Sequence, residues 1–328
     1  MACYVCRCPE IESVHGNYVS DSGIRYAVHP GTGIQIVKCP QCGFMSVEFA
    51  HPGVVAQLYE NQDLAPLSVD KSEHANLHRD NCQNQLNSWT KHLPEKSGRT
   101  LFWGAGRSEH ADSYLALTNE MFTCDLVPEN NELARQKSTM TVIDRHALRD
   151  PAYEETFDLI ILSNVLERMP FPRSQLSLCA RLLKSGGILA LEVPSMNFDL
   201  VRTWEYGPEE LNYFSAKSVE TLVSLEGNFS LMALYEDNEP AELKNATGYW
   251  PGDNNASSSQ SRAVLRAIMK NQRCQVNSPQ PDILTEDLGL HLHMLSLTCL
   301  ITGLSHHRYS NELNPKSGTP LPIGFEGH

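Results

Sequence analysis

The stretch Thr100–Gly106, which reads TLFWGAG, decides the fold because an apolar run passes directly into a glycine turn. Such a turn after a buried strand lets a ligand approach bare backbone at the start of the next helix. Asp125 follows 19 residues after Gly106, where the next strand is expected to end. A carboxylate at that point can accept both ribose hydroxyls of an adenosine. The stretch therefore predicts an α/β domain that binds a nucleotide-like ligand.

Two later segments extend this pattern. Phe157–Leu162 (FDLIIL) is a short, continuously apolar run of the kind that a central parallel strand needs. Leu182–Leu191 (LLKSGGILAL) combines the end of a helix, a glycine turn and another apolar strand. Glu109 occupies the position where a dinucleotide-binding fingerprint requires a small residue, so an NAD site is less favoured.

Together with Ser163–Met169 (SNVLERM), these segments resemble the class I S-adenosylmethionine (SAM) dependent methyltransferases. The resemblance implies a doubly wound, Rossmann-like α/β sheet and SAM as the cofactor. It implies that Asp144 lies against the adenine amino group, although an aspartate in a surface turn is an equally good interpretation. The SAM-binding residues that we expect are Gly104, Ala105, Gly106, Asp125, Leu126, Asp144 and Ser163.

Two cysteine pairs near the N-terminus have the spacing of a metal site. Cys3 and Cys6 form one C-x-x-C knuckle, and Cys39 and Cys42 form a second knuckle 32 residues later. Four thiolates in this arrangement close a tetrahedral zinc site on a small β-ribbon, and the metal then stabilises a segment too small to fold alone. Cys8 does not fit a knuckle and is either a bystander or an alternative ligand. The clustering favours metal ligation in a reducing compartment over disulfides.

The resemblance extends to this N-terminal region. Cys39–Phe44 (CPQCGF), followed by Leu58–Glu60 (LYE), is similar to the opening of zinc-ribbon methyltransferases from sugar and natural-product pathways. In that family the ribbon helps to enclose the substrate, which implies that Tyr59 lies near the sulfonium. A tyrosine that packs between helices is the alternative.

The sequence divides into five expected parts. They are a zinc ribbon (1–52), a helical linker or lid (53–98), a SAM-binding core (99–237), a helical C-terminal extension (238–310) and a tail (311–328). Leu86 and Trp89 are expected to point inward from the linker. Within the extension, the segments Ser261–Asn271 and Leu284–Leu304 are expected to be helical.

Composition excludes several classes of partner. The formal charge of −13 and the pI near 5.4 disfavour nucleic acid, so a small-molecule or carrier-bound substrate is expected. Neither a signal-like N-terminus nor a run of 18 apolar residues occurs, which predicts a cytoplasmic protein with no membrane partner. The sequence leaves the oligomeric state open.

The chain departs from the family pattern at three positions. Phe102 replaces an acidic residue that helps to seat the amino acid part of SAM. Arg168 and Glu210 replace two histidines, and we interpret them either as drift in a surface pair or as an ion pair in a remodelled substrate pocket. Because an arginine is a poor base at neutral pH, Glu210 or Tyr213 is the candidate general base. The expected catalytic residues are Glu167, Arg168, Glu210 and Tyr213.

These features predict SAM-dependent methyl transfer to a small-molecule acceptor of secondary or glycan metabolism. An acceptor that is already nucleophilic, such as an amine, thiol or carboxylate, suits a site that lacks both histidines. Two alternatives remain open. One is a non-methylating enzyme on the same fold, and the other is a non-catalytic SAM-fold protein that binds a partner.

Overall fold

The computed structural model describes residues 2–14, 18–19, 25–26, 35–48, 83–104, 109–125, 128–196, 210–238 and 263–273. The chain divides into two compact units, residues 1–276 and 277–328, and the second unit lies outside the described residues. Several expected features lie outside them too, namely Tyr59, Ala105, Gly106, Leu126, the helix Leu284–Leu304 and the C-terminal tail. No helix in the described part of the chain is long and apolar enough to span a membrane.

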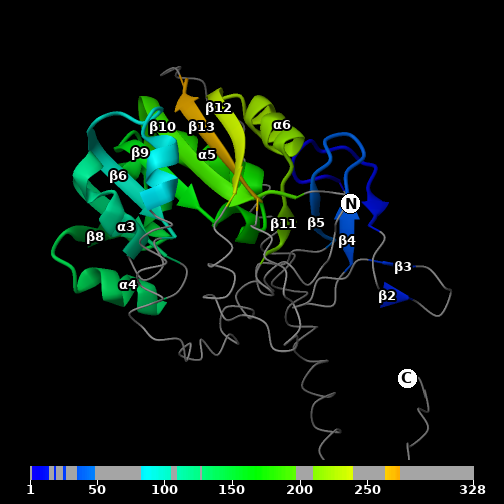
Figure 1. Cartoon of the computed structure of the whole chain (residues 1–328), viewed down its shortest axis with the longest axis horizontal. Helices are drawn as coiled ribbons and strands as arrows, with labels where there is room; N and C mark the ends of the chain where they lie inside the picture. The colour runs from blue at the N-terminus through cyan, green and yellow to red at the C-terminus, as the bar shows by residue number, and fades with distance from the viewer. Residues whose placement is uncertain are drawn as a thin grey trace, which may run out of the picture. The chain divides into compact units, whose positions relative to one another are not determined.

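A seven-stranded sheet with the order β8-β7-β6-β9-β10-β13-β12 forms the centre of the fold (Figure 1). The strands from β8 to β10 are parallel, whereas β13 is antiparallel to both of its neighbours. This arrangement confirms the expected doubly wound α/β sheet. Its strands are β6 (Ser97–Trp103), β7 (Thr118–Cys124), β8 (Met140–Val142), β9 (Phe157–Ser163), β10 (Leu183–Pro194), β12 (Phe229–Asn238) and β13 (Ala263–Asn271).

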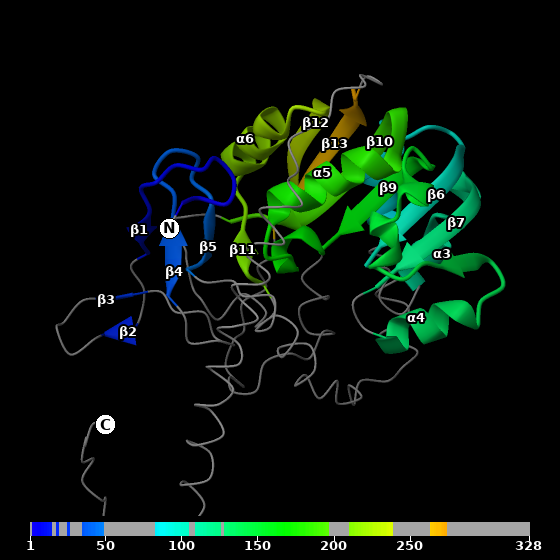
Figure 2. The same ribbon diagram turned by 180° about the vertical axis from the view of Figure 1, so that it is seen from behind.

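Helices pack on both faces of this sheet. Residues 83–89 are helical and lie in front of the strands in Figure 1, whereas α5 lies in front of them when the molecule is seen from behind (Figure 2). Leu86 and Trp89 are buried, as expected. The labelled helices are α3 (Glu109–Ser113), α4 (Pro128–Arg135), α5 (Pro172–Leu182) and α6 (Ala216–Glu226), with 3-10 turns η1 (Leu115–Leu117), η2 (Ala147–Arg149), η3 (Pro151–Tyr153) and η4 (Leu166–Arg168).

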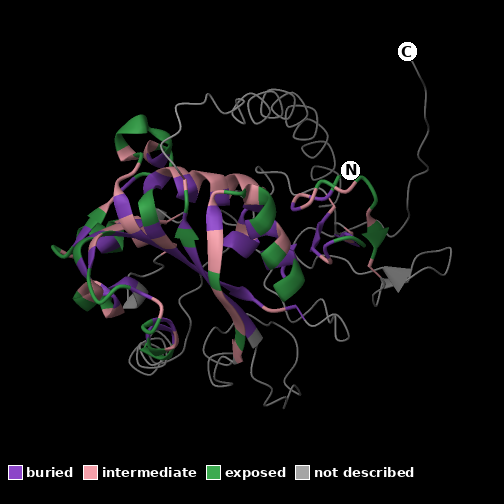
Figure 3. Ribbon diagram, turned by 90° about the horizontal axis from the view of Figure 1, so that it is seen from above, coloured by how far each residue is buried: buried purple, intermediate pink, exposed green. Residues whose placement is uncertain are grey.

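The continuous apolar run in β9 is explained by burial on both faces of the sheet. Ile160 and Leu162 belong to the core cluster that includes residues of α5 and α6, whereas Leu159 and Ile161 belong to the cluster that includes Leu86 and Trp89. This alternation is the two-residue period of a strand. Both faces need apolar side chains, so the central strands are buried over most of their length (Figure 3).

The N-terminal segment shares a second, four-stranded sheet with the core. Its strands are β1 (Glu12–Ser13), β4 (Ile36–Lys38), β5 (Met45–Val47) and β11 (Asn212–Tyr213), in the order β1-β4-β5-β11. A separate hairpin joins β2 (Tyr18–Val19) to β3 (Arg25–Tyr26). Because β11 comes from the chain that follows β10, its pairing with β5 ties the N-terminal segment to the core.

The expected helix over Ser261–Asn271 is wrong, because Ala263–Asn271 forms strand β13. Its alanine, leucine, arginine and methionine residues are good helix formers, which misled the prediction. The strand pairs with β10 on one side and with β12 on the other, and Val264–Met269 is buried throughout. Tertiary pairing therefore overrides local propensity, and the core sheet extends beyond residue 237.

A buried ion pair joins the two antiparallel neighbours β10 and β13. Arg266 Nε lies 2.6 Å from Glu192 Oε2, and the two side chains are only 3% and 1% exposed. Arg266 also pairs with the part-exposed Asp237 of β12. Burial opposes the charge of Arg266, but the Glu192 and Asp237 carboxylates raise its pKa above the ordinary value. The arginine therefore stays charged in the core and links three adjacent strands.

We expect the Glu192–Arg266 pair to be costly to break from one side. Arg266→Met leaves a buried carboxylate without its cation and should lower the free energy of unfolding by about 3–5 kcal/mol. The double variant Glu192→Leu/Arg266→Met removes both charges and should recover part of that loss. Urea denaturation of the parent, of Glu192→Leu, of Arg266→Met and of the double variant measures the coupling energy. If the two single losses of stability add up to the loss in the double variant, the pair does not act as a unit.

Candidate functional site

The candidate site lies at the carboxyl edge of the parallel strands. Gly104 follows β6, Asp125 follows β7 and Asn164 follows β9, and these three strands are neighbours in the order β7-β6-β9. The Gly104 N–H donates to the Cys124 carbonyl at 2.7 Å, which places the glycine directly beside the end of β7. Ligands of open parallel sheets bind at this edge, where successive strands and loops diverge.

Two constraints require a glycine at position 104. Its φ is +79°, in the left-handed region that other residues rarely adopt. A Cβ at this position would also overlap the Cγ2 of Val165, which follows Asn164 at the end of β9. The bare backbone therefore lets the ends of β6 and β9 approach each other closely at the point where the expected ligand-binding turn begins.

Asp125 is held at the same edge by helix α4. The Asn130 Nδ2 donates to Asp125 Oδ1 at 3.2 Å, while the Asn131 side chain bonds both the Asp125 N–H and its carbonyl, at 3.0 and 2.9 Å. These bonds fix the backbone and restrict the carboxylate of a half-buried residue. The sequence indicated Asp125 from its distance to the glycine turn, but it did not reveal the two asparagines that orient it.

The other two described residues expected to contact SAM differ in their surroundings. Asp144 is exposed, and its Oδ1 accepts the His146 N–H at 2.7 Å, which is the geometry of the surface-turn alternative. Ser163 is buried, where its hydroxyl accepts from Gln85 Nε2 at 2.7 Å and donates to Glu192 Oε1 at 3.1 Å. A contact between either side chain and SAM remains a prediction.

Two segments are expected to hold the methyl acceptor, Glu167–Met169 and Asn212–Phe214, and they lie side by side. The Leu211 N–H donates to the Glu167 carbonyl at 2.8 Å, and Asn212 Nδ2 donates to the Met169 carbonyl at 2.5 Å. Asn212 also bonds the carbonyls of Leu166 and Glu167. This asparagine side chain therefore fixes the turn η4 against the segment that leads into β11.

Charged side chains accompany these backbone contacts. Glu167 and Glu210 are both buried, whereas Arg168 is part-exposed, with its Nε 3.3 Å from Glu167 Oε1. Arg168 thus has a carboxylate partner on its own turn, and its pairing with Glu210 remains a prediction. Buried carboxylates are costly unless they are paired or hydrogen-bonded, so Glu167 and Glu210 mark this region as polar.

Tyr213, a second expected catalytic residue of this segment, packs against apolar side chains. It lies in a small apolar cluster with Ile36, Met45 and Met196, and it is only 3% exposed. This cluster joins the N-terminal sheet to the core. The position gives Tyr213 a clear packing role, and its action as a base remains a prediction.

Sequence reasoning missed a buried polar cluster beneath the same edge. Glu192 Oε1 accepts from Gln85 Nε2 at 2.5 Å, from Ser163 at 3.1 Å and from Asn164 Nδ2 at 3.1 Å, and Tyr114 donates to Gln85 Oε1 at 2.7 Å. Glu192 interrupts the apolar run of β10, and this charged residue in a buried strand was the signal that could have revealed the cluster.

The N-terminal knuckles bring four of the first five cysteines together. The Sγ atoms of Cys3, Cys6, Cys39 and Cys42 all lie within 4.8 Å of one another, with separations of 3.6 Å for Cys3–Cys42 and 3.4 Å for Cys6–Cys39. In a tetrahedral site with zinc–sulfur bonds of about 2.3 Å, sulfurs lie roughly 3.8 Å apart. The observed donor set fits such an ion, and Cys8 is not part of it.

The two knuckles have matching turns. The Arg7 N–H donates to the Cys3 carbonyl and the Gly43 N–H donates to the Cys39 carbonyl, both at 2.9 Å, and both donors have positive φ.

The cysteine thiols also change one another's pKa values. A hydrogen bond from Cys42 lowers the pKa of Cys3 to about 5, while burial raises the pKa of Cys39. Close, buried thiols of this kind suit a cation that replaces their protons.

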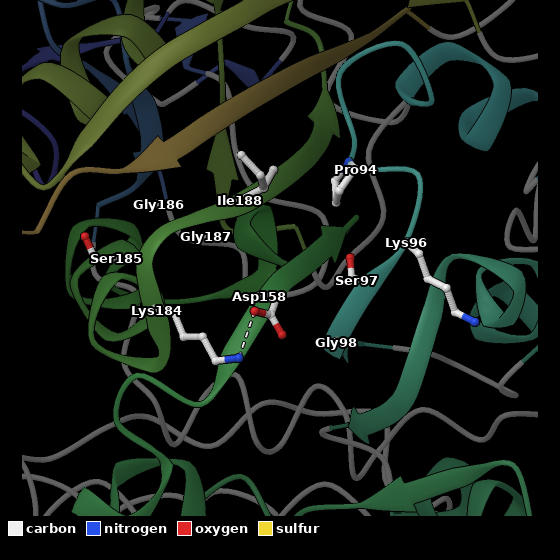
Figure 4. A pocket seen from close by; sticks show the side chains of 10 residues that line it. All are labelled: Pro94, Lys96, Ser97, Gly98, Asp158, Lys184, Ser185, Gly186, Gly187 and Ile188. Carbon is white, nitrogen blue, oxygen red and sulfur yellow. Dashed lines mark hydrogen bonds and ion pairs between the residues drawn. The ribbon is translucent and has the colours of Figure 1, made fainter.

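A separate hollow of about 280 Å³ lies at the opposite, amino edge of the sheet (Figure 4). Its walls include Ser97 and Gly98 of β6 and the Lys184–Gly187 segment at the start of β10, and the Lys184 Nζ pairs with Asp158 Oδ1 at 2.8 Å. The pKa of Asp158 is lowered because Lys184 and the Arg99 N–H outweigh its burial. Lys184 and Asp158 pair with each other in this hollow, which lies away from the glycine turn.

Part of the core matches a known protein family. Residues 101–191, from β6 through most of β10, match the model of a family described as a methyltransferase domain. This stretch is similar to a methyltransferase domain. It contains Gly104, Asp125 and Asn164, whereas the N-terminal cysteines and β13 lie outside the matched residues. No curated protein was found to match the sequence of the chain.

Solved structures with a similar arrangement include the YcgJ protein from Bacillus subtilis, at 16% identity and a TM-score of 0.46, covering 60% of this chain and 100% of that one. A SAM dependent methyltransferase from Archaeoglobus fulgidus has 15% identity and a TM-score of 0.43, covering 59% of this chain and 94% of that one. The [4+2]-cyclase SpnF has 12% identity and a TM-score of 0.46, covering 58% of this chain and 81% of that one.

We predict that the matched region of the core does not tolerate a side chain at position 104. Gly104→Ala incurs both the left-handed backbone strain and the overlap with Val165, so it should lower the free energy of unfolding by about 2–4 kcal/mol. Gly227→Ala is the matched control, because Gly227 has the same φ of +79° but open space around its Cβ position. It should cost only about 1 kcal/mol in urea denaturation. Equal costs would show that Val165 is not a constraint.

Proposed function

We propose that this chain is a SAM-dependent methyltransferase that acts on a small-molecule acceptor of secondary or glycan metabolism. The observation that carries the proposal is the meeting of Gly104 and Asp125 at the carboxyl edge of a methyltransferase domain. A bare glycine backbone and an oriented carboxylate on adjacent strands are what an adenosyl ligand requires. The acidic charge of −13 supports a small-molecule or carrier-bound acceptor in preference to nucleic acid.

The residues divide into two groups around this edge. On the β6–β7 side, Asp125 holds the ribose hydroxyls and the glycine turn accommodates the rest of the cofactor, with Asp144 placed toward the adenine. On the other side, η4 and the Asn212–Phe214 segment border the acceptor, because Asn212 bonds the η4 turn directly. When bound, SAM supplies an electrophilic methyl group on a sulfonium.

Orientation provides most of the catalysis in this proposal. Holding the acceptor atom in line with the methyl group replaces a bimolecular encounter with a positioned one, which contributes several kcal/mol of rate acceleration. A base is needed only when the acceptor must first lose a proton. Glu210, which is buried, is the stronger candidate for that base, because Tyr213 packs in an apolar cluster. An amine, thiol or carboxylate acceptor needs no strong base.

We assign a structural zinc ion to Cys3, Cys6, Cys39 and Cys42. Four thiolates fill all tetrahedral positions, so such an ion has no open position for substrate. Its role is to hold the two knuckles together beside β5, which pairs with β11 and thereby supports the acceptor segment. The zinc would therefore stabilise the segment that borders the acceptor indirectly, through the sheet that β5 and β11 share.

The decisive experiment is to measure cofactor binding and product formation on the full chain. Isothermal calorimetry with S-adenosylhomocysteine tests the adenosyl site, and mass spectrometry after incubation with SAM and panels of amines, thiols, carboxylates and sugars tests the reaction. Binding together with a mass gain of one methyl group supports methyl transfer. Binding with a different product favours a non-methylating enzyme, and a chain that binds no nucleoside overturns the proposal.

We expect Asp125→Ala to weaken S-adenosylhomocysteine binding about tenfold or more, because charged hydrogen bonds to the ribose are lost. The control is Asp150→Ala, since Asp150 caps η3 on the path into the amino end of β9 and should leave affinity unchanged. Calorimetry on both variants checks the assignment. The same affinity for Asp125→Ala and the parent protein would reject the ribose contact.

We expect Cys39→Ser to release zinc and to lower the melting temperature more than it slows methyl transfer by the protein that remains folded. Cys8→Ser is the matched control, because the Cys8 thiol lies outside the four-sulfur cluster. Elemental analysis should give one zinc per chain for the parent and for Cys8→Ser. Zinc retained in full by Cys39→Ser, or no zinc in the parent, contradicts the assignment.

A further inference from the structure

The backbone of Asn164 stands out among the described residues at the carboxyl edge. Its φ is +53°, a left-handed conformation that only two other described non-glycine residues, Arg7 and Glu155, share. Asparagine tolerates this conformation better than most residues, but strained positions of this kind persist where the surroundings enforce them and often mark functional sites. The following residue, Val165, is the one that approaches Gly104.

Glu192 fixes the Asn164 amide in one orientation. The Asn164 N–H donates to the Glu192 carbonyl at 3.0 Å, and its Nδ2 donates to Glu192 Oε1 at 3.1 Å. Both bonds run toward β10. Since the oxygen and nitrogen of an amide diverge from the same carbon, Oδ1 must turn away from Glu192. No described residue donates to this oxygen, and the residue is only part-buried.

The carboxylate that imposes this orientation is itself immobile. Glu192 is buried, its Oε2 pairs with Arg266, and its Oε1 accepts three hydrogen bonds, from Gln85, Ser163 and Asn164. A fully satisfied buried network of this kind rigidifies its members. The Asn164 amide therefore presents a preoriented hydrogen-bond acceptor at the edge of the sheet.

Asn164 lies where the amino acid part of the expected cofactor would be. Asp125 and Asn164 follow strands on opposite sides of β6, so they are separated by two strand spacings, or roughly 10 Å. If Asp125 holds the ribose, the amino acid part of the ligand extends across the glycine turn toward β9. Its ammonium group then needs acceptors there, because β6 carries no carboxylate and Phe102 is fully buried.

We propose that Asn164 Oδ1 accepts a hydrogen bond from the ammonium group of SAM, with Glu192 as the residue that positions the amide. The inference rests on the proposed function, since it requires an adenosyl ligand at this edge. It adds a specific side-chain contact for the amino acid part of the cofactor and gives the buried Glu192–Arg266 pair a task in ligand binding.

Two ligands separate this contact from the rest of the site. S-adenosylhomocysteine carries the ammonium group, whereas 5′-methylthioadenosine has the adenosine and sulfur but lacks the amino acid part. Asn164→Gly removes the side chain and suits the left-handed backbone, so the variant is expected to fold. Calorimetry should show about tenfold weaker binding of S-adenosylhomocysteine and an unchanged affinity for 5′-methylthioadenosine.

The control is Glu155→Gly, which removes a side chain at a similar φ of +49° just before the amino end of β9. It should alter neither affinity. The positioning role of Glu192 is tested with Glu192→Gln. This change should lower the affinity for S-adenosylhomocysteine relative to that for 5′-methylthioadenosine in the parent protein, but it should not change this ratio in Asn164→Gly. A purely structural role for Glu192 would instead weaken both ligands together, in both backgrounds.

The outcomes distinguish this inference from the proposed function. If the parent protein binds neither ligand, the proposed function fails. If the parent protein binds both and Asn164→Gly either leaves S-adenosylhomocysteine unaffected or weakens both ligands equally, the proposed function stands and the ammonium contact is overturned.

Discussion

The packing of β10 between β9 and β13 is the constraint on which the rest of the structure depends. On one side β10 continues the parallel sheet, and on the other it meets an antiparallel strand, so its backbone bonds are satisfied along both edges. Glu192 sits where these pairings meet, directly across from Ser163 and from Arg266. A single buried carboxylate therefore orients the end of β9 and holds β13 in place, and desolvation makes any loss of one partner costly.

The carboxyl edge of the sheet derives its geometry from that central pairing. With β9 fixed by β10, Val165 can approach Gly104, and the turn after β6 is left without room for a Cβ. On the far side, α4 supplies the two asparagines that hold Asp125. The site is thus built by rigid strands and helices that position a few polar groups, which is how α/β folds prepare ligand sites before a ligand arrives.

The N-terminal segment is connected to this edge through backbone hydrogen bonds. Strand β5 pairs with β11, and the Val47 N–H donates to the Leu211 carbonyl at 2.9 Å. The Leu211 N–H in turn reaches the carbonyl of Glu167, so three segments distant in sequence meet at one point. Under the proposed function, the cysteine knuckles influence the acceptor side without touching it, because a loss of order in β5 would release the segment that borders the acceptor.

The sequence alone determined the central features of the fold and of the site. Three of these features are local patterns: apolar strands that end in glycine turns, the spacing to Asp125 and the paired cysteines. Each depends on residues that lie close together in the sequence, so the sequence alone is enough to predict it. Tertiary structure alone decided that residues 263–271 form a strand, because pairing with β10 and β12 outweighs their helix propensity. It also decided that Glu192, Gln85 and Asn164 share one network. Gln85 is 107 positions from Glu192 and Asn164 is 28 positions from it, so the three residues meet only when the sheet and its covering helix are assembled.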